Sequence, residues 1–91
     1  MKYLICYDIS DNKCRRRVVK CLESMARRLQ YSVFVADCSP TKIEEAKKQL
    51  WLLVSGVDGC YITIAPLCQA CAEKIMQYGK EREEYEPCII L

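Results

Sequence analysis

Apolar and polar residues alternate along this chain with two different periods, which predict strands and helices in turn. Residues 2–7 (KYLICY) form a short apolar run that predicts a strand buried on both faces. Residues 12–26 carry apolar side chains at the helical period, with most basic side chains off that stripe. Residues 28–37 are β-branched and aromatic, which predicts one strand, or two short strands with a bulge between them.

The second half of the chain continues this alternation. Pro40 and the capping-box sequence TKIE at residues 41–44 predict a second helix that ends at Ser55. The remaining expected segments are a strand at residues 60–65, a weaker helix at 67–79, a charged connector at 80–86 and an apolar tail at 87–91. That tail must be covered by its own sheet or by a neighbour's.

This order of elements is typical of an α+β fold, a ferredoxin-like two-layer sandwich with two main helices on one face of an antiparallel sheet. We assign residues 1–79 to the ferredoxin-like domain and residues 80–91 to a C-terminal connector and tail strand of the same functional unit. Because a 91-residue domain buries proportionally little surface, we expect association through the uncovered sheet face or the tail.

Composition narrows the class of protein. A content of 52% apolar and 29% charged residues is that of a globular domain. No uncharged run approaches the ~20 apolar residues of a membrane span, and the N-terminus does not resemble a signal peptide. The chain has no histidine, which excludes Ser-His-Asp, Cys-His and His-ligated zinc chemistry. We therefore expect a cytoplasmic single domain with no membrane partner.

Eight cysteines are unusual in so short a chain. Most occupy apolar positions of the predicted elements, which favours reduced thiols in a core over a secreted disulfide scaffold. Only Cys68 and Cys71 have the CxxC spacing of a metal or redox pair. Because one CxxC supplies half of a structural zinc site, zinc would have to be shared by two chains. The simpler interpretation is that both cysteines are structural.

Basic residues are concentrated near the N-terminus, although the net charge is only +2. Residues 1–30 hold eight Lys or Arg and three acidic residues, whereas the rest of the chain holds six and nine. The clustered side chains include Arg15, Arg16, Arg17, Lys20, Arg27 and Arg28. Such a cluster is typical of phosphate contacts, and the alternative is an ordinary solvated helix face.

Asp8 is the strongest candidate for chemistry. It follows the first predicted strand and precedes a helix cap at Ser10 or Asp11, so its carboxylate should emerge at the end of the sheet. There it could hold Mg²⁺, while the nearby arginines bind phosphate. The alternative is a turn or capping residue paired with an arginine.

Mg²⁺ uses one or two carboxylates together with water, so a second acid would strengthen the site. A chain related by a two-fold axis would supply a second Asp8. Asp11 and Asp37 are the other candidates, and each is more simply a cap or a strand-end residue.

Three blocks together resemble the signature of the CRISPR-associated Cas-two family, small proteins that work with the Cas-one integrase in acquiring spacers. They are residues 7–11 (YDISD), 15–18 (RRRV) and 28–34 (RLQYSVF). The resemblance extends over essentially the whole chain. It implies a ferredoxin-like homodimer in which the C-terminal strand adds to the partner's sheet.

The resemblance also implies roles for individual residues. Asp8 would face its symmetry mate and bind a divalent metal, Mg²⁺, with Tyr7 in support. Phe34 lies in the motif that shapes the cleft. The phosphate path would be lined by Arg15, Arg17 and Arg28.

Two functions follow from the resemblance, with a third independent of it. The first is a metal-dependent endoribonuclease or DNase acting on single-stranded RNA or DNA. The second is a non-catalytic bridge that holds duplex DNA for the integrase. The third is a small regulatory domain with zinc at Cys68 and Cys71.

The sequence departs from the family pattern at two places besides its cysteines. Residues 24–26 (SMA) replace a glycine that often closes the first helix, and Val35 replaces a common acidic residue. The second departure bears on nuclease activity more than on the fold.

Overall fold

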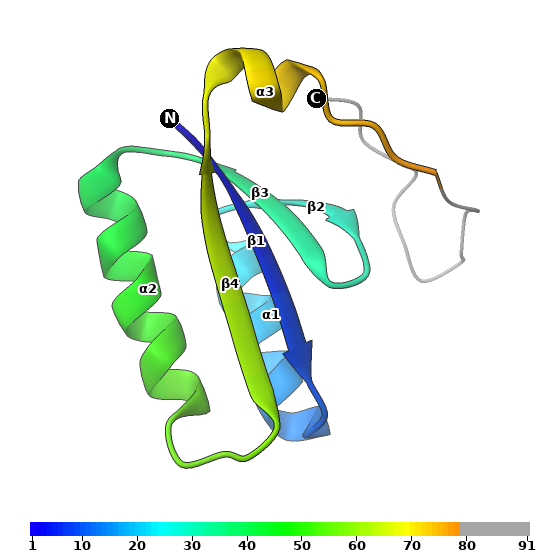
Figure 1. Ribbon diagram of the computed structural model, residues 1–91. Coiled ribbons are helices and arrows are strands. Elements are labelled where there is room, and N and C mark those ends of the chain that lie inside the picture. The colour runs from blue at the N-terminus through cyan, green and yellow to red at the C-terminus, as the bar shows by residue number, and fades with distance from the viewer. Residues whose placement is uncertain (79–91) are drawn as a thin grey trace.

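The computed structural model describes residues 1–78, which form a four-stranded sheet covered on one face by two helices (Figure 1). The elements are β1 (Lys2–Ile9), α1 (Asn12–Glu23), β2 (Arg27–Gln30), β3 (Val33–Asp37), α2 (Pro40–Val54), β4 (Cys60–Leu67) and α3 (Gln69–Glu73). The strand order is β2-β3-β1-β4, and each neighbouring pair is antiparallel. This confirms the predicted α+β, ferredoxin-like sandwich. The predicted connector and tail strand lie outside the described residues.

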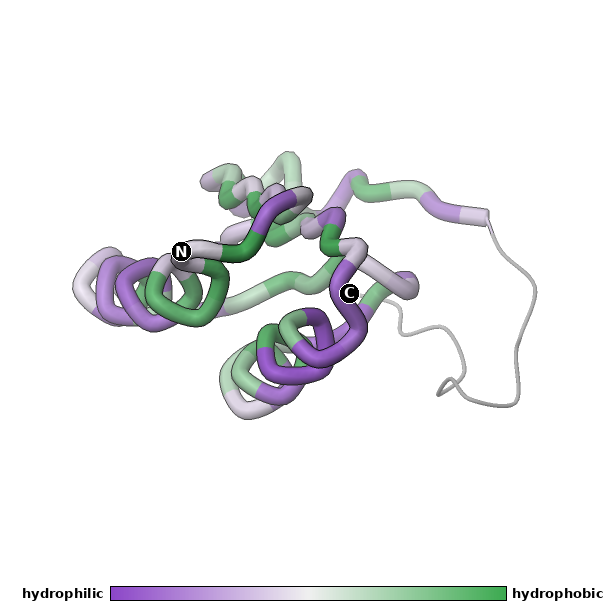
Figure 2. The backbone as a smooth tube through the Cα atoms, turned by 90° about the horizontal axis from the view of Figure 1, so that it is seen from below, coloured by the Kyte–Doolittle hydropathy of each residue, from purple (hydrophilic) through white to green (hydrophobic). Residues whose placement is uncertain are grey.

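The core lies between the sheet and the helices α1 and α2 (Figure 2). Its fully buried side chains are Phe34, Ile5, Leu22, Leu50 and Val18. Along β1, burial alternates: Tyr7 and Ile9 are buried, whereas Cys6 is half-buried and Asp8 is exposed. Within residues 1–78 the prediction that residues 2–7 are buried on both faces was therefore wrong, because α1 and α2 bury one face and leave the other half-buried.

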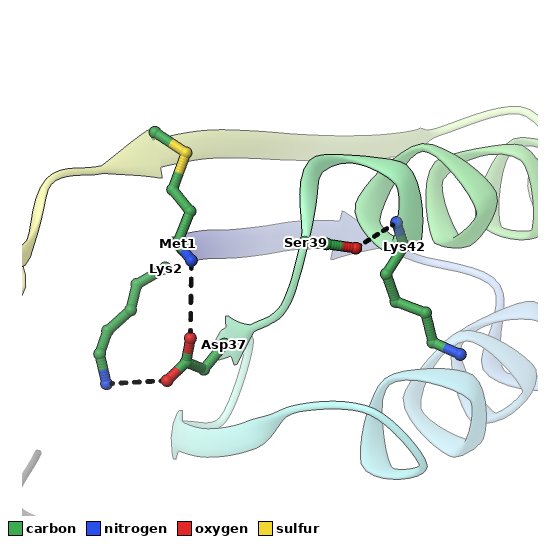
Figure 3. Close-up of polar contacts among 5 residues, drawn as sticks. All are labelled: Met1, Lys2, Asp37, Ser39 and Lys42. Carbon is green, nitrogen blue, oxygen red and sulfur yellow. Dashed lines mark hydrogen bonds and ion pairs between the residues drawn. The ribbon is translucent and has the colours of Figure 1, made fainter.

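The helix starts follow from local capping chemistry. The Cys14 N–H donates a 2.7 Å hydrogen bond to the Asp11 carboxylate, which confirms Asp11 as one of the two predicted caps of α1. Helix α2 is capped by Ser39, whose hydroxyl accepts from the Lys42 N–H at 3.2 Å (Figure 3). The predicted Thr41 capping box was wrong. Pro40 stands in the first turn of α2, a position that proline suits, so the helix begins before Thr41.

The segment at residues 28–37 folds as a hairpin, the second of the two predicted alternatives. Strands β2 and β3 are joined by a turn at Tyr31 and Ser32, and their register shifts between Arg28 and Gln30. Because of this bulge, the four-residue strand β2 pairs with β3 although one residue of β2 has no partner.

On the sheet face opposite α1 and α2, side chains near β2 and β3 are buried within residues 1–78. Val35 and Leu29 are buried, at 3% and 7% exposure, although Val35 pairs with Leu4 on the face away from the helical core. Gln30 Nε2 donates to Gln77 Oε1 at 3.4 Å, so the chain that follows β4 returns across β2. Asp8 lies on the same face and is exposed within residues 1–78.

Candidate metal and nucleic-acid site at the end of strand β1

Asp8 lies near the end of β1, on the sheet face away from α1 and α2. It pairs directly with Tyr61 of β4, and Tyr61 is 69% exposed. Side chains of residues directly opposite each other project from the same face of a sheet. The Asp8 side chain is exposed, and no side chain within residues 1–78 pairs with its carboxylate. The alternative of a structural Asp8–arginine pair is therefore not present in the described part of the chain.

The loop before β4 closes tightly against the end of β1. The Ser10 N–H donates to the Gly59 carbonyl at 3.4 Å, and Gly59 has a φ of +72°. A Cβ atom at Gly59 would lie 2.8 Å from Ser10 Oγ, so only glycine allows this approach. The close approach brings Asp58, an exposed acid that the sequence did not single out, to the same end of the sheet.

The carboxylates of Asp11 and Asp37 make contacts of their own and do not join Asp8. Asp11 caps α1, as described above. Asp37 lies 3.8 Å from the N-terminal amine of Met1 and 3.6 Å from Lys2 Nζ (Figure 3). Because Lys2 pairs with Asp37 and Asp8 stands six positions further along β1, the two acids are separated by roughly 20 Å. The interpretation of both residues as a cap and a strand-end residue agrees with these contacts.

Arg15 is held against the end of β1. Its Nη1 atom donates to the Ile9 carbonyl at 3.0 Å, and its Nη2 atom donates to the Asn12 side chain. Ile9 immediately follows Asp8, so a guanidinium group lies beside the strand end that carries the carboxylate. This is the arrangement that the sequence predicted for Arg15.

The outer surface of α1 carries what we call the basic stripe, formed by four exposed side chains at helical spacing. They are Lys13, Arg16, Arg17 and Lys20. No ion pair within residues 1–78 neutralises any of them. The stripe extends the positive charge of Arg15 along the helix, as a phosphate-binding surface requires.

Tyr7, Arg28 and Phe34 form one packed group behind Asp8. The Tyr7 hydroxyl donates to the Tyr31 carbonyl at 2.9 Å, and Arg28 Nη2 donates to that hydroxyl at 3.4 Å. The Arg28 guanidinium lies over the Phe34 ring at 5.2 Å and the Tyr31 ring at 5.6 Å, and 3.9 Å from the Glu23 carboxylate. These are the contacts of a residue that stabilises the hairpin. A phosphate contact by Arg28 stays a prediction.

A family model described as CRISPR associated protein Cas2 matches residues 1–75 of this chain. The chain belongs to the Cas2 family. A CRISPR-associated endoribonuclease Cas2 from Rhodospirillum rubrum is 36% identical over 92 residues, covering 99% of this chain and 73% of that relative. Another from Archaeoglobus fulgidus is 40% identical over 73 residues, covering 79% of this chain and 77% of the relative.

Solved structures agree with the fold of the Cas2 family. The crystal structure of Streptococcus pyogenes Cas2 matches with a TM-score of 0.77 at 23% identity, over 87% of this chain and 100% of that one. A further crystal structure of Cas2 matches with a TM-score of 0.69 over 98% of both chains. At 23% identity the first likeness concerns the fold alone. Within residues 1–78, no helix is long and apolar enough to span a membrane.

The CxxC pair lies far from Asp8. Cys68 caps α3 just after Leu67, which pairs with Lys2 at the other end of β1. The Cys71 N–H donates to Cys68 Sγ at 3.3 Å, and both side chains are exposed. Hydrogen bonding from the Cys71 thiol lowers the pKa of Cys68 and raises the pKa of Cys71.

Residues 1–78 assemble no complete zinc site by themselves. Among residues 1–78, no group of three or more Cys, Asp or Glu side chains is placed to hold a metal ion. All cysteines in this range are free thiols, as the sequence analysis expected. Zinc at Cys68 and Cys71 would still need ligands from outside residues 1–78.

Sequence reasoning missed Tyr61 and Asp58 as neighbours of the Asp8 end. Neither belongs to a local motif, and both reach this end only through the pairing of β4 with β1. Strand alternation places Tyr61 on one face of β4, but only the register identifies Asp8 as its partner.

Proposed function

We propose that this Cas2-family chain is a metal-dependent endonuclease of the endoribonuclease class that works as a cytoplasmic homodimer in spacer acquisition. The observation that supports this most directly is the exposed Asp8 carboxylate, which has no side-chain partner within residues 1–78, at a strand end where Arg15 binds the adjacent Ile9 carbonyl. The relatives from Rhodospirillum rubrum and Archaeoglobus fulgidus are both named CRISPR-associated endoribonuclease. Partnership with the Cas-one integrase is part of the same proposal.

The donor set at this position fits Mg²⁺ when two chains combine. Mg²⁺ takes oxygen ligands, commonly one or two carboxylates together with water and substrate phosphate. Asp8 contributes one exposed carboxylate per chain, without a side-chain partner within residues 1–78, so a two-fold axis near Asp8 would supply the pair. The half-buried apolar side chains Leu4 and Cys6 on that face support its use as the dimer contact.

Each residue of the site would have its own role in phosphodiester cleavage. Bound Mg²⁺ would offset negative charge at the scissile phosphate. Arg15, fixed by the Ile9 carbonyl, holds positive charge at the strand end. Arg16 and Arg17 of the basic stripe bind the flanking phosphates. The Tyr7–Tyr31 hydrogen bond joins the end of β1 to the turn between β2 and β3 and so supports the backbone next to Asp8.

A second candidate function is a non-catalytic bridge for duplex DNA. The observation that favours it is the basic stripe, which is independent of Asp8 and suits a continuous phosphate backbone. Val35 is apolar and buried, so the acidic side chain that β3 has on the face of Asp8 is Asp37, which lies at the other end of the sheet. In this function Asp8 is dispensable and the stripe is essential.

Cleavage assays separate these two functions. Labelled single-stranded RNA and duplex DNA are incubated with the wild type, Asp8→Asn and Asp37→Asn, each with Mg²⁺ and with EDTA. Asp37 is the matched control, an exposed acid at the other end of the same sheet. The nuclease proposal expects cleavage by the wild type and Asp37→Asn with Mg²⁺, and none by Asp8→Asn. If no protein cuts, yet all three bind duplex DNA with a steep salt dependence, the bridge function stands instead.

A further inference from the structure

Two thiols from distant parts of the chain meet beneath the Asp8 end of the sheet. Cys14, in the first turns of α1, and Cys60, the first residue of β4, have their Sγ atoms 3.9 Å apart. The fold brings them together because Cys60 pairs with Ile9, which leads into the cap of α1. The contact is independent of the function proposed above.

The two thiols differ in access. Cys14 is 4% exposed, and its thiol also donates to the Leu53 carbonyl at 3.5 Å. Cys60 is half-buried, and its thiol approaches the Asp58 carbonyl at 3.9 Å in the exposed loop. Burial, followed by hydrogen bonding to Cys60, raises the pKa of Cys14. Cys60 is therefore the thiol that a dissolved reagent reaches first.

We propose that Cys14 and Cys60 form a redox-active dithiol, which small disulfides of the glutathione class oxidise to an intrachain disulfide. A disulfide holds its sulfur atoms at about 2.0 Å, so these two need to approach by about 1.9 Å. Such a movement is within the reach of side-chain rotation at a half-buried position.

The reaction proceeds by two exchanges and balances without another reagent. The Cys60 thiolate attacks one sulfur of the small disulfide, which forms a mixed disulfide and releases one small thiol. The Cys14 thiolate then attacks Cys60 Sγ, which closes the intrachain bond and releases the second small thiol. Two protein thiols are oxidised, one small disulfide is reduced, and both thiol protons leave with the products or to solvent.

The bond would join two elements that flank the end of β1. It would tie the first turns of α1 to the start of β4, on either side of Ile9. Oxidation would therefore restrain the segment that carries Asp8 and Asp11, whereas reduction would release it. Cys68 and Cys71 cannot exert this restraint, because they lie at the other end of β4.

The test uses the full chain with Cys68 and Cys71 changed to serine, which removes the competing exposed pair. The reduced protein is treated with oxidised glutathione, blocked with N-ethylmaleimide and analysed by peptide mass spectrometry. The proposal expects a linked Cys14–Cys60 peptide pair, a loss of two free thiols per chain and a higher Tm. Adding Cys60→Ser to this background should abolish all three changes.

Two results would overturn the proposal. One is a glutathione adduct that persists on Cys60 while Cys14 remains free to react with maleimide after denaturation. The other is a bond between Cys60 and any cysteine other than Cys14. Because Cys60 is half-buried and Cys14 is in the core, Cys60→Ser is the variant that best preserves the fold.

Discussion

The Tyr7 hydroxyl donates a 2.9 Å hydrogen bond to the Tyr31 carbonyl, which joins strand β1 to the turn between β2 and β3. The same hydroxyl accepts from Arg28, and the Tyr7 N–H donates to the Ser32 carbonyl at 3.1 Å. Three bonds from one residue therefore hold the hairpin turn beside Asp8. The YDISD and RLQYSVF blocks are therefore in direct contact in the fold.

Replacement of Tyr7 by Phe should lower the free energy of unfolding by about 1 to 2 kcal/mol. The Tyr31 carbonyl and the Arg28 guanidinium each lose a hydrogen-bond partner at a part-buried position. Urea unfolding measures the loss. Tyr3→Phe is the matched control, because Tyr3 is equally buried and its hydroxyl makes no side-chain bond within residues 1–78. Equal losses in both variants would contradict the role given to the Tyr7 hydroxyl.

Replacement of Asp11 by Ala should cost about 1 kcal/mol of stability, because the Cys14 N–H loses its capping acceptor. Asp11→Asn should restore most of this, since an amide oxygen also caps a helix. Thermal and urea unfolding of the three proteins compare these effects. If the Asn variant were as unstable as the Ala variant, the negative charge of Asp11, and not its capping hydrogen bond, would account for its contribution to stability.

Reversal of charge at Arg16 and Arg17 should weaken duplex binding at least tenfold and reduce its dependence on salt. Loss of two phosphate contacts should lower the slope of log affinity against log salt by about two. The control is the double variant Lys42→Glu and Lys48→Glu, which changes charge equally on exposed positions of α2. Binding titrations at several salt concentrations compare them. Similar effects from both pairs would mean that net charge, and not the basic stripe, governs binding.

Cys68 should be alkylated by iodoacetamide at lower pH than an ordinary thiol. The thiolate is the reacting form, and hydrogen bonding from the Cys71 thiol lowers the pKa of Cys68. Its thiolate fraction, and hence its rate, therefore rises at pH values below 9.0, the usual value, whereas Cys71 requires higher pH. The alkylation rates of Cys68 and Cys71, measured at several pH values by peptide mass spectrometry, test this prediction.

The variant Cys71→Ala provides the control for Cys68. It removes the thiol donor but keeps the Cys71 backbone N–H, so the Cys68 profile should move partway back to higher pH. An unchanged Cys68 profile in this variant would contradict the assigned cause.

Much of the fold follows from local patterns in the sequence. The run before Asp8, the stripe of residues 12–26 and the apolar run from Cys60 predicted β1, α1 and β4, because hydrophobic period is a local property. The start of α2 was misjudged because Ser39 and Thr41 both suit a cap and only the packed helix selects between them. Local pattern also could not show that α1 and α2 leave one face of β1 uncovered.

The candidate site was predictable where its residues adjoin in sequence and not elsewhere. Asp8 in β1 and Arg15 in α1 are joined by a short connection, so the contact of Arg15 with the end of β1 could be expected from the sequence. The separation of Asp37 from Asp8, the approach of Tyr61 and the contact of Cys14 with Cys60 depend on strand register. A single sequence does not determine register, since it arises from packing between distant segments.

The central claim is that two Asp8 carboxylates, one from each chain of a dimer, hold one divalent cation. The most direct measurement is a titration of the full-length protein with Mn²⁺ as a paramagnetic substitute for Mg²⁺, followed by electron paramagnetic resonance. The account predicts one tightly bound ion per two chains in the wild type and in Asp37→Asn, and none in Asp8→Asn. Retention of the bound ion in Asp8→Asn, or one ion on every monomeric chain, would contradict it.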